Sequence, residues 1–119
     1  MTKVLYIEDD ILTGQICSKM FEMIPNTSLK VCTSGYEAIE HLKSHQYDLI
    51  LLDLSLPDIS GLKIADCLRS QHELTIPMVL TSAHIDSDMS SSLVDQVVEK
   101  PMTIAKLKEI LTRHTNYSS

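Results

Sequence analysis

Four groups of polar residues stand at the ends of short apolar runs, and together they could transfer a phosphoryl group. Glu8 and Asp9 follow the first run, Asp53 ends the third, Ser82 follows the fourth and Lys100 follows the last. Carboxylates held close together repel one another unless a cation lies among them. Hard oxygen ligands suit Mg²⁺, which keeps several waters and bridges to phosphate. A carboxylate nucleophile, a metal, a lysine and a hydroxyl donor are the parts needed to phosphorylate an aspartate.

The apolar runs have the pattern of buried strands. The run Leu49–Leu52 ends on Asp53, and a loop with Pro57 and Gly61 follows at once. A continuous apolar run of this length is typical of a strand buried on both faces. A carboxylate at its end is costly unless it has a function or a charged partner. Strands are expected at Val4–Ile7, Leu29–Cys32, Leu49–Leu52, Met78–Thr81 and Val97–Val98.

Amphipathic stretches between these runs predict helices. The first, Ile11–Ile24, is stopped by Pro25. Its apolar residues near one face are Leu12, Ile16, Met20, Met23 and Ile24. Further helices are expected from the capping box Ser34–Glu37 onward, at Gly61–Arg69, in the serine-rich stretch Asp86–Leu93 and after the cap Thr103.

Alternation of strands and helices predicts an α/β domain. Right-handed βαβ crossovers give a parallel sheet with helices on both faces, which is a three-layer, doubly wound architecture. The carboxyl ends of its strands form the edge where ligands bind in such sheets. No linker or repeat interrupts the pattern, so we expect a single domain over residues 1–119, with no output domain in this chain.

Composition excludes several classes of protein. A chain of 119 residues that is 44% hydrophobic can fill one core, but it is too short for two domains. A net charge of −6 argues against direct binding to nucleic acid. Three cysteines without CxxC spacing indicate buried thiols in a reducing compartment. Since neither a signal peptide nor a long apolar run occurs, we expect a soluble, cytoplasmic protein without membrane contact.

Over essentially its whole length, the chain resembles the receiver domains of two-component response regulators. The matching residues are the pair Glu8-Asp9, Asp53 within the stretch 51–61, Ser82-Ala83 and Lys100-Pro101. All four motifs occur in order and at near-family spacing. The resemblance implies a flavodoxin-like (βα)5 fold with a five-stranded parallel sheet of order 2-1-3-4-5.

The resemblance also implies a phosphorelay function. Asp53 would accept a phosphoryl group from the phosphohistidine of a histidine kinase or a histidine phosphotransfer protein, and this would switch the interaction with a partner. Mg²⁺ would be held by Asp9, Asp53 and the backbone carbonyl of Ser55, with Glu8 acting through water. Such a domain is no general enzyme, because it catalyses only its own Mg²⁺-dependent phosphorylation and dephosphorylation. We expect a monomer or a weak dimer.

Other family positions concern the phosphoryl group itself. Lys100 would contact it, and Ser82, next to Ala83, would swing towards it as the switch. Ser55 and His84 occupy positions that influence how fast the acyl phosphate hydrolyses. The Lys100–Pro101 bond is usually cis in the family.

Two features depart from the family pattern. Val97 stands where the family usually has an aromatic residue, so no ring can report a movement of Ser82. The segment between Ser82 and Lys100 is shorter than usual by about one helical turn and is rich in serine. We therefore expect the fourth helix to be short or irregular.

Three alternatives remain beside this interpretation. A receiver-like interaction module independent of phosphorylation is favoured by Val97, but the intact acidic pair and Lys100 speak against it. A haloacid-dehalogenase-type hydrolase needs a second Asp where this chain has Ser55, so its general acid is missing. A flavin-binding flavodoxin is disfavoured because acids follow the first strand and would repel a phosphate.

Four further residues have simpler interpretations. Asp10 is expected to cap a helix near the metal, and Asp58 to form a turn rather than act as a catalytic acid. His41 and His45 are four residues apart, a spacing that could hold a metal. A solvated helix face is the better interpretation of that pair.

Overall fold

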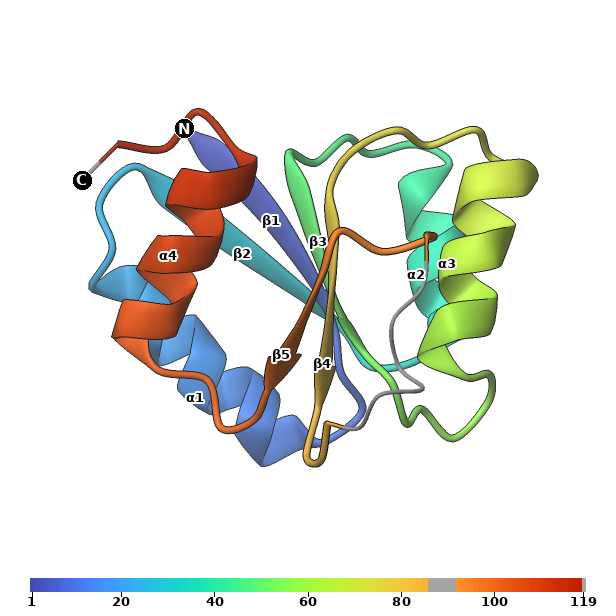
Figure 1. The fold of residues 1–119 in the computed structure, drawn as a ribbon, viewed down its shortest axis with the longest axis horizontal. Coiled ribbons are helices and arrows are strands. Elements are labelled where there is room, and N and C mark those ends of the chain that lie inside the picture. Colours follow the sequence, from blue (N-terminus) through green and yellow to red (C-terminus); the bar gives the residue numbers. More distant parts are fainter. Residues whose placement is uncertain (86–91, 119) are drawn as a thin grey trace.

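A parallel five-stranded sheet forms the centre of the molecule in a computed structural model that describes residues 1–85 and 92–118. Its order is β2-β1-β3-β4-β5, which confirms the expected flavodoxin-like sheet (Figure 1). Each predicted strand is present and is up to a few residues longer than expected. The strands are β1 (Thr2–Ile7), β2 (Thr27–Cys32), β3 (Leu49–Asp53), β4 (Met78–Ser82) and β5 (Gln96–Glu99).

The helices begin at side chains that satisfy their first free N–H groups. The caps Asp10, Ser34, Ser60 and Thr103 each accept a hydrogen bond from the backbone nitrogen three residues on. The helices of the described residues are α1 (Ile11–Glu22), α2 (Gly35–Leu42), α3 (Gly61–Ser70) and α4 (Ile104–His114). The helix expected at Asp86–Leu93 falls largely on residues 86–91, which lie outside the described residues.

Helices cover both faces of the sheet, so the domain has three layers. Figure 1 shows α1 and α4 against one face and α2 and α3 against the other. Alternation along β1 serves both layers, since Val4 and Tyr6 join the core beneath α1 and α4, whereas Leu5 and Ile7 join the core beneath α2 and α3. Cys17 and Cys32 are buried thiols, as expected, whereas Cys67 is only half-buried.

The face by which α1 packs differs from the predicted one. Leu12, Ile16 and Met23 were expected on the inner face, but they are 63%, 51% and 68% exposed. The buried stripe of α1 is Gly14, Cys17 and Phe21. Gly14 belongs to this face because the helix lies close to β2 there: a Cβ on Gly14 would meet Val31 Cγ1 at 3.2 Å. The aliphatic side chains of Ile11, Leu12 and Ile16 are left facing outward.

Strand register aligns the carboxyl ends of the strands. Ile7 pairs with Leu52, so Glu8 and Asp53 follow at matching heights on β1 and β3. In the neighbouring ladders, Asp53 pairs with Thr81, and Ser82 pairs with Glu99. All four polar groups singled out in the sequence thus reach one edge of the sheet. Among the described residues, no helix has the length and apolar character to cross a membrane.

Candidate functional site

Three carboxylates gather beyond the ends of β1 and β3. Glu8, Asp9 and Asp53 each offer an oxygen, and these oxygens lie within 4.8 Å of one another. Glu8 and Asp53 are only 1% and 5% exposed, whereas Asp9 is open to solvent. The predicted proximity of Asp9 and Asp53 is therefore confirmed. A compact set of hard oxygen donors with one side open to water fits Mg²⁺, which retains part of its hydration shell.

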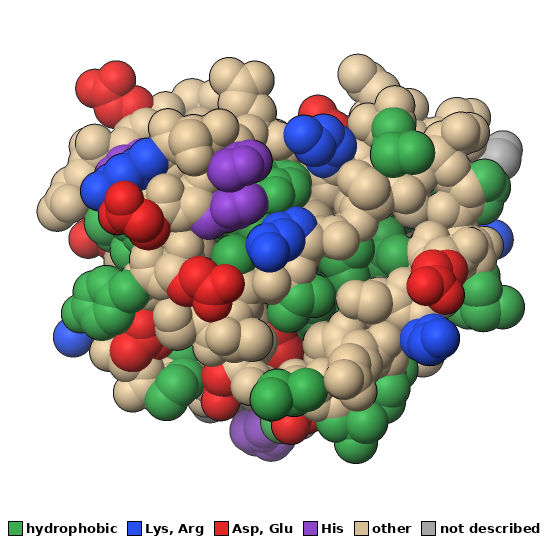
Figure 2. All heavy atoms as spheres, turned by 180° about the vertical axis from the view of Figure 1, so that it is seen from behind, with side chains coloured by type: hydrophobic (Ala, Val, Ile, Leu, Met, Phe, Trp, Pro, Cys, Tyr) green, Lys and Arg blue, Asp and Glu red, His purple; other side chains and the backbone are tan. Residues whose placement is uncertain are grey.

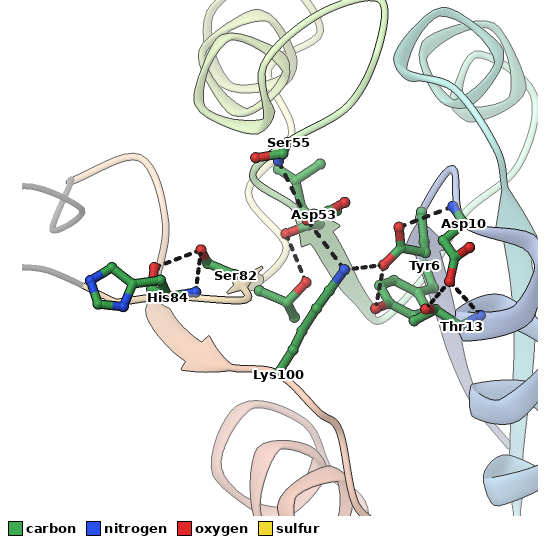
Figure 3. A network of polar contacts seen from close by, with 11 residues as sticks. Tyr6, Asp10, Thr13, Asp53, Ser55, Ser82, His84 and Lys100 are labelled. Atoms are coloured by element: carbon green, nitrogen blue, oxygen red, sulfur yellow. Dashed lines mark hydrogen bonds and ion pairs between the residues drawn. The ribbon is translucent and has the colours of Figure 1, made fainter.

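Lys100 supplies the positive charge that faces these acids. Its Nζ forms an ion pair with Glu8 Oε1 and lies 3.5 Å from Asp53 Oδ1. Figure 3 shows the Lys100 side chain extended toward Asp53. The backbone holds this position, because the Lys100 N–H donates to the carbonyl of Ser82 at 2.7 Å. The Lys100–Pro101 bond is cis, as the family resemblance predicted.

One lysine does not balance two buried acids equally. Burial raises the pKa of Asp53 to about 6, the charge of Glu8 adds to this, and Lys100 opposes it. Burial alone would also raise the pKa of Glu8, but the hydrogen bond and charge of Lys100 hold it below its usual value. Burial by itself would lower the pKa of Lys100, yet the two carboxylates raise it. Asp53 is thus the anion that an added cation would stabilise most.

Ser82 lies at the same edge with its hydroxyl turned elsewhere. Its Oγ donates to the carbonyl of His84 at 2.7 Å and accepts from the His84 N–H at 3.3 Å. Figure 3 shows this hydroxyl directed toward residue 84, and the His84 ring directed away from Asp53. Ala83 and His84 are both exposed. The expected neighbourhood is present, but Ser82 must rotate before its hydroxyl can face Asp53.

The loop after β3 folds back on Asp53. Ser55 donates its backbone N–H to Asp53 Oδ1 at 3.4 Å, and the Gly61 N–H donates to the carbonyl of Leu54 at 2.9 Å. Gly61 has to be a glycine, because a Cβ there would meet the carbonyl oxygen of Asp53 at 2.4 Å. These contacts hold the backbone of Ser55 beside the acids.

The same loop is fastened to α2. Asp58 accepts hydrogen bonds from the backbone nitrogens of Gly35 and Tyr36, at 3.1 and 3.0 Å. Gly35 also leaves room for the loop, because a Cβ there would stand 2.3 Å from Ile59 Cγ2. Asp58 is therefore no part of the acidic cluster, in line with its expected non-catalytic part, but its bonds to α2 were not foreseen.

A second unforeseen contribution comes from Tyr6. Its hydroxyl donates to Glu8 Oε1 at 3.1 Å from within the core. Residues two apart in a strand point to the same side, so the position of Tyr6 before Glu8 was the available signal. Asp10, by contrast, is the predicted cap of α1 and accepts from the Thr13 N–H at 3.0 Å.

The pair His41 and His45 is stacked, with ring centroids 4.0 Å apart. His41 is half-buried and its Nε2 lies 2.6 Å from the hydroxyl of Tyr47. A solvated face therefore describes His45 but is wrong for His41. Within residues 1–85 and 92–118, the one group of at least three metal-ligating side chains is the acidic cluster, so the pair has no third ligand.

Comparisons with known proteins match this site and fold. The family model of the response regulator receiver domain matches residues 4–112. The chain is 31% identical over 114 residues to the transcription factor SKN7 of Saccharomyces cerevisiae, and 32% identical over 115 residues to the aerobic respiration control sensor protein ArcB of Escherichia coli. These matches cover 93% and 92% of this chain, but only 18% and 15% of those proteins. The chain thus spans less than a fifth of the length of either relative.

Solved structures show the same similarity. A CheY-like receiver domain from Methylobacillus flagellatus has a TM-score of 0.85 at 30% identity, covering 95% of this chain and 98% of that one. The response regulator TrrA of Thermotoga maritima, in complex with Mg²⁺-BeF, has a TM-score of 0.84 at 27% identity, with coverage of 95% and 98%. TrrA in complex with the histidine kinase ThkA has a TM-score of 0.82 at 29% identity, with coverage of 95% and 97%.

Proposed function

The chain belongs to the response regulator receiver domains, and from this premise we propose that Asp53 accepts a phosphoryl group from a phosphohistidine. The observation that carries the proposal is the convergence of three carboxylates within 4.8 Å, with Lys100 reaching two of them. The receiver domain fills residues 1–119. Its own chemistry is limited to phosphorylation and dephosphorylation of Asp53.

The transfer is a displacement at phosphorus. A carboxylate oxygen of Asp53 forms the new O–P bond, the N–P bond of the donor breaks, and the imidazole leaves with the electron pair. Lys100 lies close enough to Asp53 to neutralise charge on the transferred group. Ser82, after rotating away from residue 84, would donate to a second oxygen, with Ala83 beside it. Ser55, whose backbone contacts Asp53, and His84, which follows Ser82 by two residues, would influence access of water to the acyl phosphate.

Asp9, Asp53 and the carbonyl of Ser55 would hold Mg²⁺, and Glu8 would act through a bound water. The metal supplies charge that relieves the repulsion among the acids and orients the phosphoryl oxygens. The exposure of Asp9 and the burial of Glu8 support this division. Glu8 already accepts bonds from Tyr6, Lys100 and the backbone of Asp10, so fewer of its lone pairs are free for a metal.

A surface beside the site supports docking of a histidine kinase or histidine phosphotransfer protein. Ile11, Leu12 and Ile16 of α1 are all more than half exposed. A groove of about 350 Å³ lies next to them, lined by Ile16, Met20, Lys100, Pro101 and Met102 among others. Figure 2 shows hydrophobic and acidic side chains together along the lower edge, where the strands of Figure 1 end. A partner seated there would bring its phosphohistidine to Asp53.

The test is direct phosphorylation. The protein is incubated with Mg²⁺ and a small acyl phosphate, and its intact mass is measured. We expect the wild type to gain one phosphoryl group and Asp53→Asn to gain none. Asp66→Asn, on the exposed side of α3, is the matched control and should behave as the wild type. An equal gain on Asp53→Asn, or no gain on the wild type, would refute the proposal.

A further inference from the structure

Tyr6 directs a buried hydroxyl group from the core toward the acidic cluster. The residue lies in the middle of β1, and its side chain is fully buried in the core beneath α1 and α4. The other strand residues of that core, such as Val4, Leu51 and Val79, are aliphatic, so core packing does not call for a polar atom here. The hydroxyl donates to Glu8 Oε1 at 3.1 Å (Figure 3). This bond satisfies the hydroxyl and holds the carboxylate from its core side.

Glu8 depends on a small set of donors. Its Oε1 receives Tyr6 and Lys100, and its Oε2 receives the backbone N–H of Asp10 at 3.2 Å. Lys100 is the donor that has a second task, because its Nζ also reaches Asp53. In the proposed function, Lys100 turns toward a phosphoryl oxygen. Tyr6 is then the donor that remains on Oε1 of a carboxylate only 1% exposed.

We propose that Tyr6 is a positioning residue of the phosphorylation site, whose hydroxyl keeps the Glu8 carboxylate in place for the metal and when Lys100 turns to the phosphoryl group. The inference rests on the proposed function of Asp53. A buried carboxylate that loses a donor either reorients or bears an unsatisfied lone pair. Groups that orient the surroundings of a metal in this way affect its affinity by about tenfold or more when they are removed.

Tyr6→Phe deletes one oxygen and preserves the ring. Tyr47→Phe is its matched control, since Tyr47 is partly buried and its hydroxyl is bonded to His41, remote from the acids. We expect Tyr6→Phe to weaken Mg²⁺ binding about tenfold, measured by calorimetry without any phosphodonor. Tyr47→Phe should leave the affinity unchanged. Thermal unfolding in EDTA shows whether both variants are folded.

A double-mutant cycle tests whether Tyr6 acts through Glu8. In a Glu8→Gln background, the effect of Tyr6→Phe on Mg²⁺ affinity should fall to less than twofold, because the carboxylate it positions is gone. The rate of phosphorylation by an acyl phosphate should fall for Tyr6→Phe at limiting Mg²⁺ and recover in part at saturating Mg²⁺. Unchanged Mg²⁺ affinity in Tyr6→Phe, or an undiminished effect in the Glu8→Gln background, would overturn the inference. If the wild type binds Mg²⁺ but Asp53 gains no phosphoryl group, the proposed function fails and the positioning of Glu8 is still measured.

Discussion

Lys100 Nζ lies 3.5 Å from Asp53 Oδ1 while it also pairs with Glu8, so one cation serves two buried acids. The pKa of Glu8 is held below its usual value, whereas burial raises that of Asp53 to about 6. The acid proposed as the nucleophile is therefore the one left short of positive charge in the metal-free protein. Because of this imbalance, we expect the stability of the folded protein to depend on pH and on Mg²⁺.

Asp53→Asn should stabilise the metal-free protein at high pH. A carboxyl with a pKa near 6 when folded and near 4 when unfolded contributes stability that is full below pH ~4 and lost as the pH rises through ~6. The amide never ionises, so the variant avoids this loss. We expect it to be more stable than the wild type by about 1–3 kcal/mol at pH 8, with no such advantage at pH 4. Urea unfolding in EDTA at the two values checks this, and a gain independent of pH would contradict it.

Lys100→Met should make stability strongly dependent on Mg²⁺. Without the amine, Glu8 and Asp53 face each other with no cation, and we expect the metal-free variant to lose about 2–4 kcal/mol. Because Mg²⁺ supplies the missing charge, it should raise the melting temperature of the variant more than that of the wild type. Lys43→Met is the control, since its partner Glu40 is exposed and such pairs contribute little. Equal responses of Lys100→Met and wild type to Mg²⁺ would contradict this account of the site.

Asp58→Ala should weaken Mg²⁺ binding although the residue lies outside the cluster. Its carboxylate fastens the loop that carries Ser55 to the first turn of α2. Ser34→Ala is the matched control, because it removes another cap of the same helix without touching that loop. Both variants should lose about 1 kcal/mol in urea unfolding. Only Asp58→Ala should lower the Mg²⁺ affinity by a few-fold, and the same affinity for both variants would show that the loop needs no such anchor.

Arg69→Met should be among the most destabilising changes on the surface of α3. The guanidinium is half-buried and donates to backbone carbonyls on both sides of β4, and to the Asp95 carboxylate, which itself accepts from the Met78 N–H. The carbonyls belong to Leu74, Ile76 and Leu93. Charge-assisted bonds from one guanidinium to three backbone carbonyls predict a loss of about 2–4 kcal/mol. Arg113→Met, an exposed arginine in the last turn of α4, should change urea stability by less than about 0.5 kcal/mol.

Sequence patterns predicted the sheet and the acidic edge because both follow from local rules. The apolar run Leu49–Leu52 predicts a buried strand. The alternation of strands and helices along the chain leaves few possible sheet topologies. Once strand β1 lies beside β3, Glu8 and Asp53 must meet. Proximity of these side chains was therefore predictable, whereas the direction each one takes was not. The hydroxyl of Ser82 shows this, since its rotation toward residue 84 depends on a local backbone turn.

Packing of α1 and the bonds of Tyr6 and Asp58 required the tertiary structure. Periodicity on α1 is ambiguous because apolar residues occur on several sides of the helix, and the buried stripe is the one that contains Gly14, where the helix approaches β2. Asp58 meets α2 across 22 and 23 residues of chain, a distance that no local pattern reports. Contacts of this kind depend on how the helices pack on the sheet and on the loops, which the sequence pattern of one element does not specify.

Ile59 packs so closely against Gly35 that a larger residue at position 35 would clash with it. The loop after Asp53 and the first turn of α2 are therefore expected to move together. They are connected by the hydrogen bonds of Asp58 and by the packing of Ile59 on Gly35. A displacement of the loop has to carry α2 with it or break both connections. A structural change at Asp53 would thus be transmitted to α2, on the side of the sheet opposite α1 and α4.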